Sequence, residues 1–588
     1  MIYPKIPLAQ TVIELCKAKQ IKHVVISPGS RNAPLTLGFT NNIFFKCYSI
    51  VDERCAAFFA LGIAQQLQEP TALVCTSGSA LLNYYPAVSE AFYSNIPLVV
   101  LSADRPKHLV GIGDGQTINQ KNVFKNHILY SANLKLDLKH EKQVPAHKEL
   151  PIFKNFENKI ERLLGLQKDI QVYNEEVINN AINFASLKKG PVHINVPFDE
   201  PLYETVKTLS VSPKIIDVSV QHNNIGKNVL QSCLEDWNAA SKKMVLVGVN
   251  TPNVINQKWL DKLAEDDSVI VLTETTSNLH HPSFFSSIDK LIAPLNDDKK
   301  KELQPDILLT FGGLIVSKKI KQFLRKYQPK HHWHIDNKTA NDTFFCLNKH
   351  INEEPNEFFE KFLPSVNLAH YVKSTYKSTW TAIKQQRTKK HNAYLDIVPF
   401  SDFKVFNNIL KTIPNDYILQ SGNSSTIRYT QLFKINKTIE VFCNRGTSGI
   451  DGSTSTAIGC AVVNKKPTVF ITGDLSFFYD SNALWNNYTP KNFRVIVVNN
   501  EGGGIFRILP GPKNTKNFDT YFETNHYLTA EHLCAMYGFE YKSARDEATL
   551  KSALQSFYLE DEQPKLLEVF TPKRLNDEVL LKYFEFVK

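Results

Sequence analysis

Polar residues that suit a magnesium ion follow two consecutive β-branched runs near the C-terminal end of the sequence. Asp474 directly follows the first run, and Asn500 and Gly502 follow the second. The carboxyl ends of parallel strands lie at one edge of a sheet, where α/β proteins bind ligands. A carboxylate, an amide oxygen and a backbone carbonyl near Gly502 suit Mg²⁺, and Mn²⁺ accepts the same ligands. The first predicted strand-end segment comprises Gly473, Asp474, Leu475 and Ser476.

Each half of this pattern also has a simpler explanation. Asp474 alone fits a solvated carboxylate, and Asn500 with the glycines after it fits a turn. We favour the metal site because a predicted strand precedes each half. The glycines would also let the backbone approach a diphosphate closely.

Glu53 lies in a second candidate segment, VDERCAAFFALG at 51–62. An apolar run stops there, three charged residues follow, and a helix rich in small residues begins. A carboxylate at a helix N-terminus is favoured by the helix dipole, which explains Glu53 without any ligand. The functional alternative is a Glu held in an apolar site to hydrogen-bond a ligand nitrogen.

Three further predicted strand ends present arginines beside small polar residues. Ser30 and Arg31 follow the first strand, where an anion could use the guanidinium and a helix N-terminus together. Arg428 and Arg445 lie in two loops beside the predicted metal segment. Isolated loop arginines are usually solvated, and the serines also fit helix caps. Two arginines beside a metal segment instead indicate carboxylate recognition.

The elements that must position these residues recur in three successive sets. Short β-branched runs that end in Gly, Ser, Asp or Asn alternate with helix-like segments, which is typical of parallel strands buried on both faces. The expected fold class is α/β, with three doubly wound domains and mainly parallel sheets. We place the domains at 1–200, 205–360 and 375–588, and we regard 140–170 as an insertion or a mobile loop.

The composition is that of a globular protein. Of 588 residues, 43% are hydrophobic and 21% are charged, and Lys plus Arg exceeds Asp plus Glu by 68 − 58 = 10. This mild positive charge favours anionic ligands, and no nucleic-acid motif accompanies it. No signal peptide or apolar run of membrane-spanning length is present, so we expect no membrane partner. Nine scattered cysteines without a C-x-x-C pair indicate reduced thiols in a cytoplasmic protein.

Gly-Asp, followed about 25 residues later by Asn-Asn, resembles the signature of thiamine diphosphate-dependent enzymes. In that family a pyrimidine-binding domain comes first, a middle domain second and a diphosphate-binding domain last. A finer resemblance is to those members that act in menaquinone biosynthesis and join 2-oxoglutarate to isochorismate with loss of CO₂. The segments that carry it are SPGSRNAPL at 27–35, VDERCAAFFALG at 51–62, TSGSALLNYYPAVSEA at 76–91, SADRP at 102–106, GNSSTIR at 422–428, NRGTSGIDGSTSTAIG at 444–459, GDLSFFYDSNAL at 473–484 and NNEGGGIFRILP at 499–510.

This resemblance implies roles for individual residues. Asp474, Asn500 and the carbonyl of Gly502 would bind the metal, Glu53 would contact the aminopyrimidine ring of the cofactor, and Ile450 would lie beneath the cofactor. Further cofactor contacts would come from Ser424, Gly473, Leu475, Ser476, Ile505, Phe506 and Leu509. The substrates would be surrounded by Ser30, Arg31, Gln116, Lys318, Lys319, Ser424, Arg428 and Arg445. The expected catalytic residues are Glu53, Ser30, Arg31, Gln116, Arg428 and Arg445.

The implied protein is a transferase that uses thiamine diphosphate and Mg²⁺ or Mn²⁺. In this family two subunits build each site, so we expect a homodimer or a homotetramer. Lys319 stands where an Arg is frequent, and Gly115 where an Asn is frequent. The charge at position 319 is kept, but a lysine cannot bind a carboxylate with the two-pronged geometry of an arginine.

Three other functions fit parts of the sequence. Another thiamine diphosphate-dependent 2-oxoacid decarboxylase or carboligase would share Glu53 and the metal pattern, but Arg428 and Arg445 favour dicarboxylate substrates. A regulatory protein that kept the fold and lost catalysis would not need an intact Glu53. A nicotinamide dehydrogenase would need a dinucleotide fingerprint, and the glycines after Asn500 lack its spacing.

Overall fold

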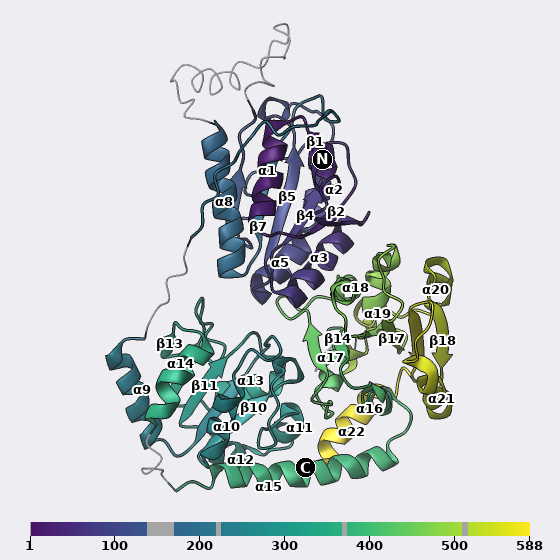
Figure 1. Cartoon of the computed structure of the whole chain (residues 1–588). Coiled ribbons are helices and arrows are strands. Elements are labelled where there is room, and N and C mark those ends of the chain that lie inside the picture. The colour runs from purple at the N-terminus through teal and green to yellow at the C-terminus, as the bar shows by residue number, and fades with distance from the viewer. Residues whose placement is uncertain (1, 138–169, 219–224, 367–372, 509–514) are drawn as a thin grey trace. The chain divides into compact units, whose positions relative to one another are not determined.

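Three parallel β-sheets organise the chain, and helices flank each of them (Figure 1). The computed structural model describes residues 2–137, 170–218, 225–366, 373–508 and 515–588. One sheet falls within each domain range expected from the sequence. This architecture confirms the α/β fold class, whereas the domain boundaries stay a prediction. The expected insertion at 140–170 lies, apart from Ile170, outside the described residues.

The N-terminal sheet has six strands, all parallel. They are β2 (His23–Ile26), β3 (Lys46–Ser49), β4 (Thr71–Cys75), β5 (Leu98–Asp104), β6 (Tyr130–Asn133) and β7 (Val192–Pro197). Their order is β3-β2-β4-β5-β7-β6. A separate antiparallel pair joins β1 (Tyr3–Pro4) to β8 (Thr205–Val206).

Helices cover both faces of this sheet, because its central strands are apolar on both sides. One face carries α1 (Pro7–Ala18), α2 (Ala33–Thr40) and α8 (Ile170–Lys188), which share a core with Val24, Val74 and Leu101 of the strands. The helices that follow β3 and β4 are α3 (Glu53–Leu67), α4 (Ser79–Asn83) and α5 (Tyr85–Ser94). α3 packs against β2, β4 and β5 and lies outside that core, on the opposite face.

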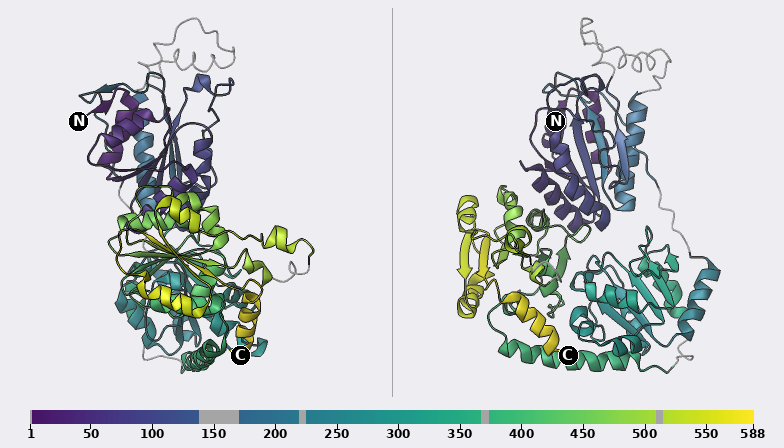
Figure 2. Two further views of the ribbon diagram at one scale, coloured as in Figure 1. Left: turned by 90° about the vertical axis from the view of Figure 1, so that its right-hand side faces the viewer. Right: turned by 180° about the vertical axis from the view of Figure 1, so that it is seen from behind.

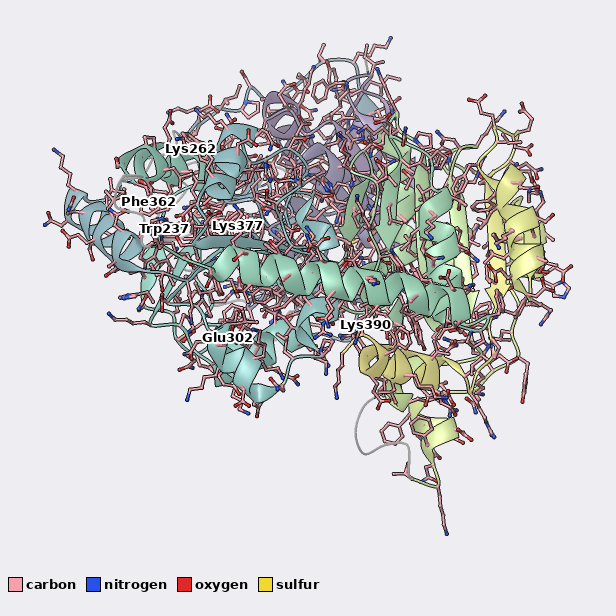
Figure 3. All side chains as sticks on the ribbon, turned by 90° about the horizontal axis from the view of Figure 1, so that it is seen from below. Trp237, Lys262, Glu302, Phe362, Lys377 and Lys390 are labelled. Carbon is pink, nitrogen blue, oxygen red and sulfur yellow. The ribbon has the colours of Figure 1, made fainter. Side chains whose placement is uncertain are left out.

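The middle sheet has five parallel strands. They are β9 (Lys243–Val247), β10 (Val269–Thr273), β11 (Ile307–Phe311), β12 (His331–Ile335) and β13 (Lys349–Ile351), in the order β10-β9-β11-β12-β13. One face is covered by α9 (Lys227–Ala239), α10 (Gln257–Glu265) and α14 (Pro355–Phe362), where the rings of Trp237 and Phe362 lie 5.3 Å apart (Figure 3). The other face carries α11 (Ile288–Ile292) and α13 (Lys318–Lys326), while α12 (Asp297–Glu302) buries no residue.

The C-terminal sheet also has six parallel strands. They are β14 (Ile418–Ser421), β15 (Glu440–Cys443), β16 (Thr468–Gly473), β17 (Arg494–Asn499), β18 (Glu540–Ala544) and β19 (Lys565–Phe570). Their order is β15-β14-β16-β17-β19-β18. The two further views in Figure 2 show the strands of this sheet lying side by side between helices.

Several helices of the C-terminal third share one core on a single face of that sheet. This core joins α16 (Asp402–Thr412), α21 (Glu547–Phe557) and α22 (Asn576–Phe586) to alternate strand residues such as Leu419, Ile471 and Leu567. α15 (Tyr376–Ile397) runs from the core of the middle sheet to this one, and Lys377 and Lys390 mark its course in Figure 3. The remaining helices are α17 (Ser425–Thr430), α18 (Ser453–Val463), α19 (Asp474–Tyr479) and α20 (Glu531–Tyr537).

By its internal contacts the chain divides into two compact units. The first comprises Met1–Val220, Gly446–Lys465 and Tyr479–Pro490. The second comprises Gln221–Arg445, Lys466–Phe478 and Lys491–Lys588. The N-terminal sheet therefore shares a unit with α18, and the middle and C-terminal sheets share the other.

The described part of the chain holds no helix that is both long and apolar enough to cross a membrane. Seven of the nine cysteines are buried. Burial raises the pKa of Cys16 and Cys534 to about 12, so the reactive thiolate form is disfavoured at both positions.

Within the first unit, α3 and α18 touch at their backbones because glycines line the contact. A β-carbon on Gly62 would lie 2.1 Å from the carbonyl oxygen of Thr456, and one on Gly459 would lie 2.0 Å from that of Phe59. Only glycine leaves room for such an approach. The middle of α3, the helix that begins with Glu53, is therefore held against α18.

We predict that Gly62→Ala destabilises the protein by about 1–3 kcal/mol, because the added methyl group would overlap backbone atoms that cannot rotate away. Urea unfolding followed by circular dichroism measures the effect. Gly115→Ala in the same unit is the control, since a β-carbon there meets nothing within 4 Å. Equal midpoints for the two variants would contradict the close packing of α3 and α18.

Candidate active site

The predicted metal segment lies at the carboxyl ends of β16 and β17, which pair in parallel. Asp474 begins α19 directly after β16 and is 2% exposed. Its Oδ2 accepts the backbone N–H groups of Asn500 at 3.1 Å and of Gly502 at 3.0 Å. Its Oδ1 accepts the N–H of Leu475 at 2.6 Å. The structure thus brings together the three residues that the sequence nominated for a metal.

Asn500 presents an oxygen that fits a cation. Its Nδ2 donates to Oδ2 of Asp402 at 3.0 Å, and this bond fixes the orientation of the amide. The amide oxygen is buried and has no hydrogen-bond partner among the described residues. A buried polar atom without a partner is unfavourable unless a ligand satisfies it. A divalent cation held by this oxygen, Asp474 and the carbonyl of Gly502 would do so, and all three ligand types suit Mg²⁺.

Asp402, which orients that amide, was not anticipated from the sequence. It lies on α16, far from Asn500 along the chain, and no local pattern marks it. Its Oδ1 accepts the hydroxyl of Thr571 at 2.6 Å. Burial raises the pKa of this carboxyl to about 6. Asp402 orients the side chain of Asn500 and is not itself one of the predicted metal ligands.

The glycine loop after Asn500 is held by Glu523. A β-carbon on Gly502 would lie 2.7 Å from the carbonyl oxygen of Glu523, and Gly502 has a φ of +149°. The N–H of Gly503 donates to the same carbonyl at 2.6 Å. The carboxylate of Glu523 is buried and forms an ion pair with Arg507. Glycine is therefore required at position 502 by both backbone conformation and space.

His526 lies close to Asp474 of the metal segment, although it belongs to none of the predicted motifs. Its Nε2 lies 3.3 Å from Oδ2 of Asp474, and its Nδ1 accepts the N–H of Leu528 at 3.1 Å. The second bond assigns the proton of the neutral ring to Nε2, which faces the carboxylate. A single histidine in a loop gave no signal in the sequence that could have identified it.

Glu53 occupies the first turn of α3 in the first unit. Asp52 caps the helix by accepting the N–H of Cys55 at 3.1 Å, and it also accepts Nδ2 of Asn482 at 2.9 Å. Burial, and secondarily the carboxylate of Glu53, raises the pKa of Cys75. Glu53 is partly buried and lies near the fully buried thiol of Cys75.

A fully buried carboxylate, Asp480, ties the start of α3 to the start of α18. It accepts the N–H of Ser455 at 2.7 Å and the hydroxyl of the same residue at 3.0 Å. The thiol of Cys55 lies 3.6 Å away and the guanidinium of Arg54 lies 3.7 Å away. Burial raises the pKa of Asp480 to about 7. Asp480 therefore holds the helical turn that carries Glu53, although no sequence pattern assigned it a role.

Glu90 on α5 anchors the loop that leads to Ile450. Its carboxylate accepts the N–H groups of Gly446 at 2.6 Å and of Thr447 at 2.7 Å, as well as the hydroxyl of Thr447 at 2.9 Å. All these residues lie in the first unit. Glu90 belongs to one of the segments that carried the family resemblance, but its anchoring role depends on tertiary contacts.

At the carboxyl edge of the N-terminal sheet, Arg31 follows β2 and Gln116 contacts the loop that follows β4. Arg31 is 7% exposed, and its guanidinium lies 3.3 Å from Glu200. Its Nε is buried without a hydrogen-bond partner in the described part of the chain. A β-carbon on Gly78 would lie 3.1 Å from the carbonyl oxygen of Gln116, so these two loops touch. Ser30, beside Arg31, is exposed.

Arg105 joins this edge, and the sequence assigned it no role although it lies in the SADRP segment. Its Nε donates to the carbonyl of Gly115 at 3.0 Å, and its guanidinium lies 3.3 Å from Asp114. The pKa of Arg31 is lowered by burial first and by Arg105 second. Two guanidinium groups therefore share this edge, which favours an anionic ligand.

The second unit holds the other predicted cations. Lys318 and Lys319 lie exposed in the first turn of α13, Arg428 lies on α17, and Arg445 follows β15. Burial lowers the pKa of Arg428, and the neighbouring Arg445 lowers it further. The Nε of Arg428 is buried and lacks a hydrogen-bond partner within the described ranges. Ser424 occupies the N-cap position of α17 with a φ of 63° and a ψ of −124°, a rare conformation for a residue with a side chain.

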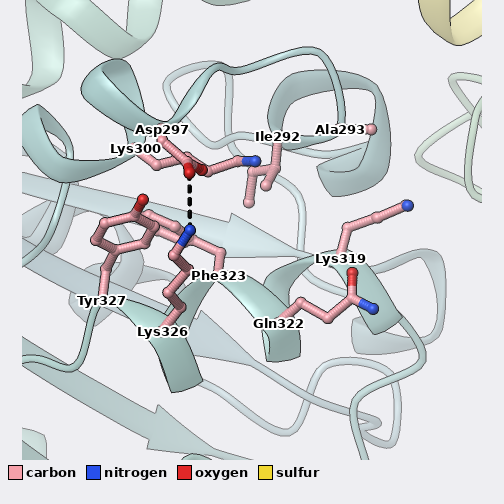
Figure 4. A pocket seen from close by; sticks show the side chains of 9 residues that line it. All are labelled: Ile292, Ala293, Asp297, Lys300, Lys319, Gln322, Phe323, Lys326 and Tyr327. Carbon is pink, nitrogen blue, oxygen red and sulfur yellow. Dashed lines mark hydrogen bonds and ion pairs between the residues drawn. The ribbon is translucent and has the colours of Figure 1, made fainter.

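A hollow beside Lys319 is lined mainly by residues of α12 and α13 (Figure 4). Lys326 and Asp297 form an ion pair there at 2.7 Å, and the amine of Lys319 points away from this pair. Both partners of the pair are exposed, so it contributes little to stability. We therefore assign the hollow no separate ligand.

The remaining predicted cofactor residues extend the metal segment along the chain. Ser476 is buried on α19, and Gly473 and Leu475 flank Asp474. Ile505 and Phe506 lie in the 3₁₀ segment η6 (Gly504–Arg507). Leu509 lies outside the described residues. The nominated residues thus form two sets, with Ser30, Arg31, Glu53, Gln116 and Ile450 in the first unit and the others in the second.

Three family profiles match the chain in the expected order. The N-terminal TPP binding domain of thiamine pyrophosphate enzymes matches residues 6–128, and the C-terminal TPP binding domain matches residues 421–569. Between them, the middle domain matches residues 220–419. The chain belongs to the thiamine pyrophosphate enzymes. This confirms the family predicted from the sequence, and it places Glu53 in the N-terminal domain of a thiamine pyrophosphate enzyme and Asp474 in its C-terminal domain.

Three relatives that match nearly the whole chain share one name, 2-succinyl-5-enolpyruvyl-6-hydroxy-3-cyclohexene-1-carboxylate synthase. The proteins from Christiangramia forsetii and Flavobacterium psychrophilum are each 56% identical to this chain over 100% of both chains. The protein from Porphyromonas gingivalis is 35% identical over 98% of this chain and 96% of its own length. The similarity therefore spans all three domains of the thiamine pyrophosphate enzyme fold.

We predict that Asp480 lowers the stability of this thiamine pyrophosphate enzyme as the pH rises from about 4 to about 7. Its pKa is raised from 3.8 to about 7 by burial, so between these values the folded protein binds more protons than the unfolded chain. The free energy of unfolding then falls by up to about 1.4 kcal/mol per pH unit. Urea unfolding at a series of pH values should show a flatter profile for Asp480→Asn, which keeps the shape and cannot titrate. Parallel profiles for the two proteins would contradict this origin.

Proposed function

We propose that this chain is a transferase that joins 2-oxoglutarate to isochorismate with loss of CO₂, giving 2-succinyl-5-enolpyruvyl-6-hydroxy-3-cyclohexene-1-carboxylate in menaquinone biosynthesis. The observation that carries the proposal is the full-length identity of 56% to two relatives that bear the name of this synthase. Another thiamine diphosphate-dependent decarboxylase or carboligase is not favoured, since the relatives compared above share that one name.

Thiamine diphosphate is the cofactor that family membership implies. When bound, it supplies a carbon nucleophile and accepts the electron pair that decarboxylation releases. We propose that Asp474, Asn500 and the carbonyl of Gly502 hold Mg²⁺ or Mn²⁺ beside its diphosphate. The unsatisfied amide oxygen of Asn500 supports this, because it is oriented by Asp402 and buried. Gly473, Leu475, Ser476, Ile505, Phe506 and Leu509 are the proposed walls of the cofactor site.

The proposed role of Glu53 is to hydrogen-bond a ring nitrogen of the cofactor from a weakly polar setting. Its position depends on residues of the same unit. Asp480 binds the first turn of α3, and the glycine contact at Gly62 holds the rest of the helix against α18. Glu90 holds the loop before Ile450, the proposed support beneath the cofactor. These contacts let the chain present both groups in a fixed conformation before any ligand arrives.

Both proposed substrates are dicarboxylates, and each unit offers cations that suit them. Arg31 and Arg428 each retain a buried Nε without a hydrogen-bond partner among the described residues, which a carboxylate would satisfy. Arg445 acts electrostatically on Arg428, and Ser30, Gln116 and Ser424 provide polar groups in their own units. Lys319 would act as a point charge and would neutralise a carboxylate without fixing its orientation.

We further propose that the protein acts as a homodimer or a homotetramer in the cytoplasm. The family resemblance implies that two subunits build each site. The burial of seven cysteines supports a reducing compartment, since no cysteine pair marks a disulfide framework.

The decisive test is consumption of isochorismate by the purified protein, followed by absorbance in the presence of 2-oxoglutarate, thiamine diphosphate and Mg²⁺. We expect consumption to require all three additions and to give a product of the mass of the decarboxylated adduct. Pyruvate in place of 2-oxoglutarate is the control, because it lacks the second carboxylate. Consumption with pyruvate at the same rate, or none with 2-oxoglutarate, would reject the proposed substrates and leave the family assignment intact.

We predict that Asn500→Ala weakens Mg²⁺ binding at least about tenfold, because it removes one of three proposed ligands. A titration with Mg²⁺ that follows the quenching of tryptophan fluorescence by thiamine diphosphate measures this. Asn436→Ala, an exposed residue of the same unit, is the control. If both variants required the same Mg²⁺ concentration as the unaltered protein, Asn500 would not be a ligand.

A further inference from the structure

A short segment after β10 connects the middle sheet to the C-terminal sheet inside the second unit. Glu274 follows β10, the 3₁₀ turn η2 (Thr275–Ser277) comes next, and Asn278 ends the segment. Nδ2 of Asn278 donates to the carbonyl of Val441 at 2.9 Å, and the N–H of Val441 donates to Oδ1 of Asn278 at 2.8 Å. The side-chain amide thus binds β15 as a neighbouring strand would. Arg445 follows two residues after the end of β15, so its position depends on this contact.

The other end of the same segment holds the start of α13. Oε2 of Glu274 accepts the N–H of Val316 at 2.7 Å, and its Oε1 accepts the N–H of Ser317 at 2.7 Å. Ser317 is the N-cap of α13, where its hydroxyl accepts the N–H of Ile320 at 3.1 Å and donates to Asp289. Both oxygens of a single carboxylate therefore fix the place where α13 begins. The first turn of this helix carries Lys318 and Lys319.

Glu274 also lies within electrostatic reach of the proposed substrate-binding arginines. It is 3% exposed, and burial raises its pKa to about 7 while Arg445 acts in the opposite direction. Burial also raises the pKa of the neighbouring Asp289, and Arg428 and Lys319 lower it. A buried carboxylate, Glu274, and a partly buried one, Asp289, thus lie among at least three cations. They offset the mutual repulsion of these cations before a substrate is bound.

We propose that Glu274 is a positioning residue for substrate recognition, because it sets the start of α13 and the approach of β15 relative to each other and so fixes the spacing of Lys319 and Arg445. The inference rests on the proposed function, in which these cations bind carboxylate groups of the substrates. Glu274 itself touches no proposed substrate group. Its loss should therefore weaken substrate binding and leave the rate at saturation nearly unchanged.

The competing explanation is that Glu274 only stabilises the fold. Glu353 allows the two to be separated, because it is another buried carboxylate of the middle-sheet region. It accepts the N–H of Ile225 and forms an ion pair with Lys361 at 2.6 Å. Neither of these partners is a nominated substrate-binding residue. Glu353→Gln should therefore reproduce the loss of stability without a change in substrate recognition.

The experiment compares Glu274→Gln and Glu353→Gln in the full-length protein loaded with thiamine diphosphate and Mg²⁺. The amide at 274 keeps the volume and one acceptor, but it turns an N–H₂ group toward a backbone N–H. We expect KM for 2-oxoglutarate or isochorismate to rise about tenfold or more with kcat within about twofold, as for one lost charge-assisted hydrogen bond. Glu353→Gln should change neither KM nor kcat beyond about twofold, even if its thermal midpoint falls as far as that of Glu274→Gln.

A binding measurement separates failure of this inference from failure of the proposed function. Calorimetric titration with glutarate, a dicarboxylate that lacks the reactive keto group of 2-oxoglutarate, reports dicarboxylate binding without turnover. Binding by the unaltered protein that weakens in Glu274→Gln alone would support the positioning role, even if isochorismate were not the second substrate. Equal affinity or equal KM in both variants, or no dicarboxylate binding by the unaltered protein, would overturn it.

Discussion

Buried carboxylates that accept backbone N–H groups hold the loops of this protein at the ends of its strands. Asp474 binds the loop after β17 in this way, Glu90 binds the loop before α18, and Glu274 binds the turn before α13. An ionised carboxylate is costly to bury unless several donors surround it. Loop N–H groups outside secondary structure need acceptors for the same reason. The carboxylate and the loop N–H groups satisfy each other's hydrogen bonds. The loop backbone is thereby held in a single conformation.

This arrangement explains how unusual backbone conformations persist where ligands are expected. Gln116, Ser424 and Glu501 have positive φ values without being glycines, and Gly502 approaches a carbonyl that a side chain would strike. Such conformations are unfavourable by about 1–3 kcal/mol each and survive only when surrounding contacts fix them. The carboxylate anchors and the ordered strand ends supply these contacts. The polar groups therefore need little rearrangement when a ligand binds, which preserves affinity.

The sequence predicted what depends on local pattern, and it could not predict what depends on tertiary contact. β-branched runs identified the strands, and the rule that parallel strands end at one sheet edge placed Asp474 beside Asn500. The order of the strands within each sheet could not be predicted, because hydrophobic periodicity does not indicate which strands pair. Asp402, Asp480 and His526 were missed for a related reason, since each acts on a residue far away in the chain and has no distinctive neighbours.

The division of the chain into units has a consequence for its topology. Because segments 446–465 and 479–490 belong to the first unit and the stretches around them to the second, the backbone passes between units five times. A single cut at one of these connections would leave four others intact, so at least one of the two fragments would still contain segments of both units. The same interleaving means that no single truncation separates one complete unit from every segment of the other. Neither unit is one continuous segment of the chain. A gene rearrangement that exchanges one unit must therefore move several segments at once.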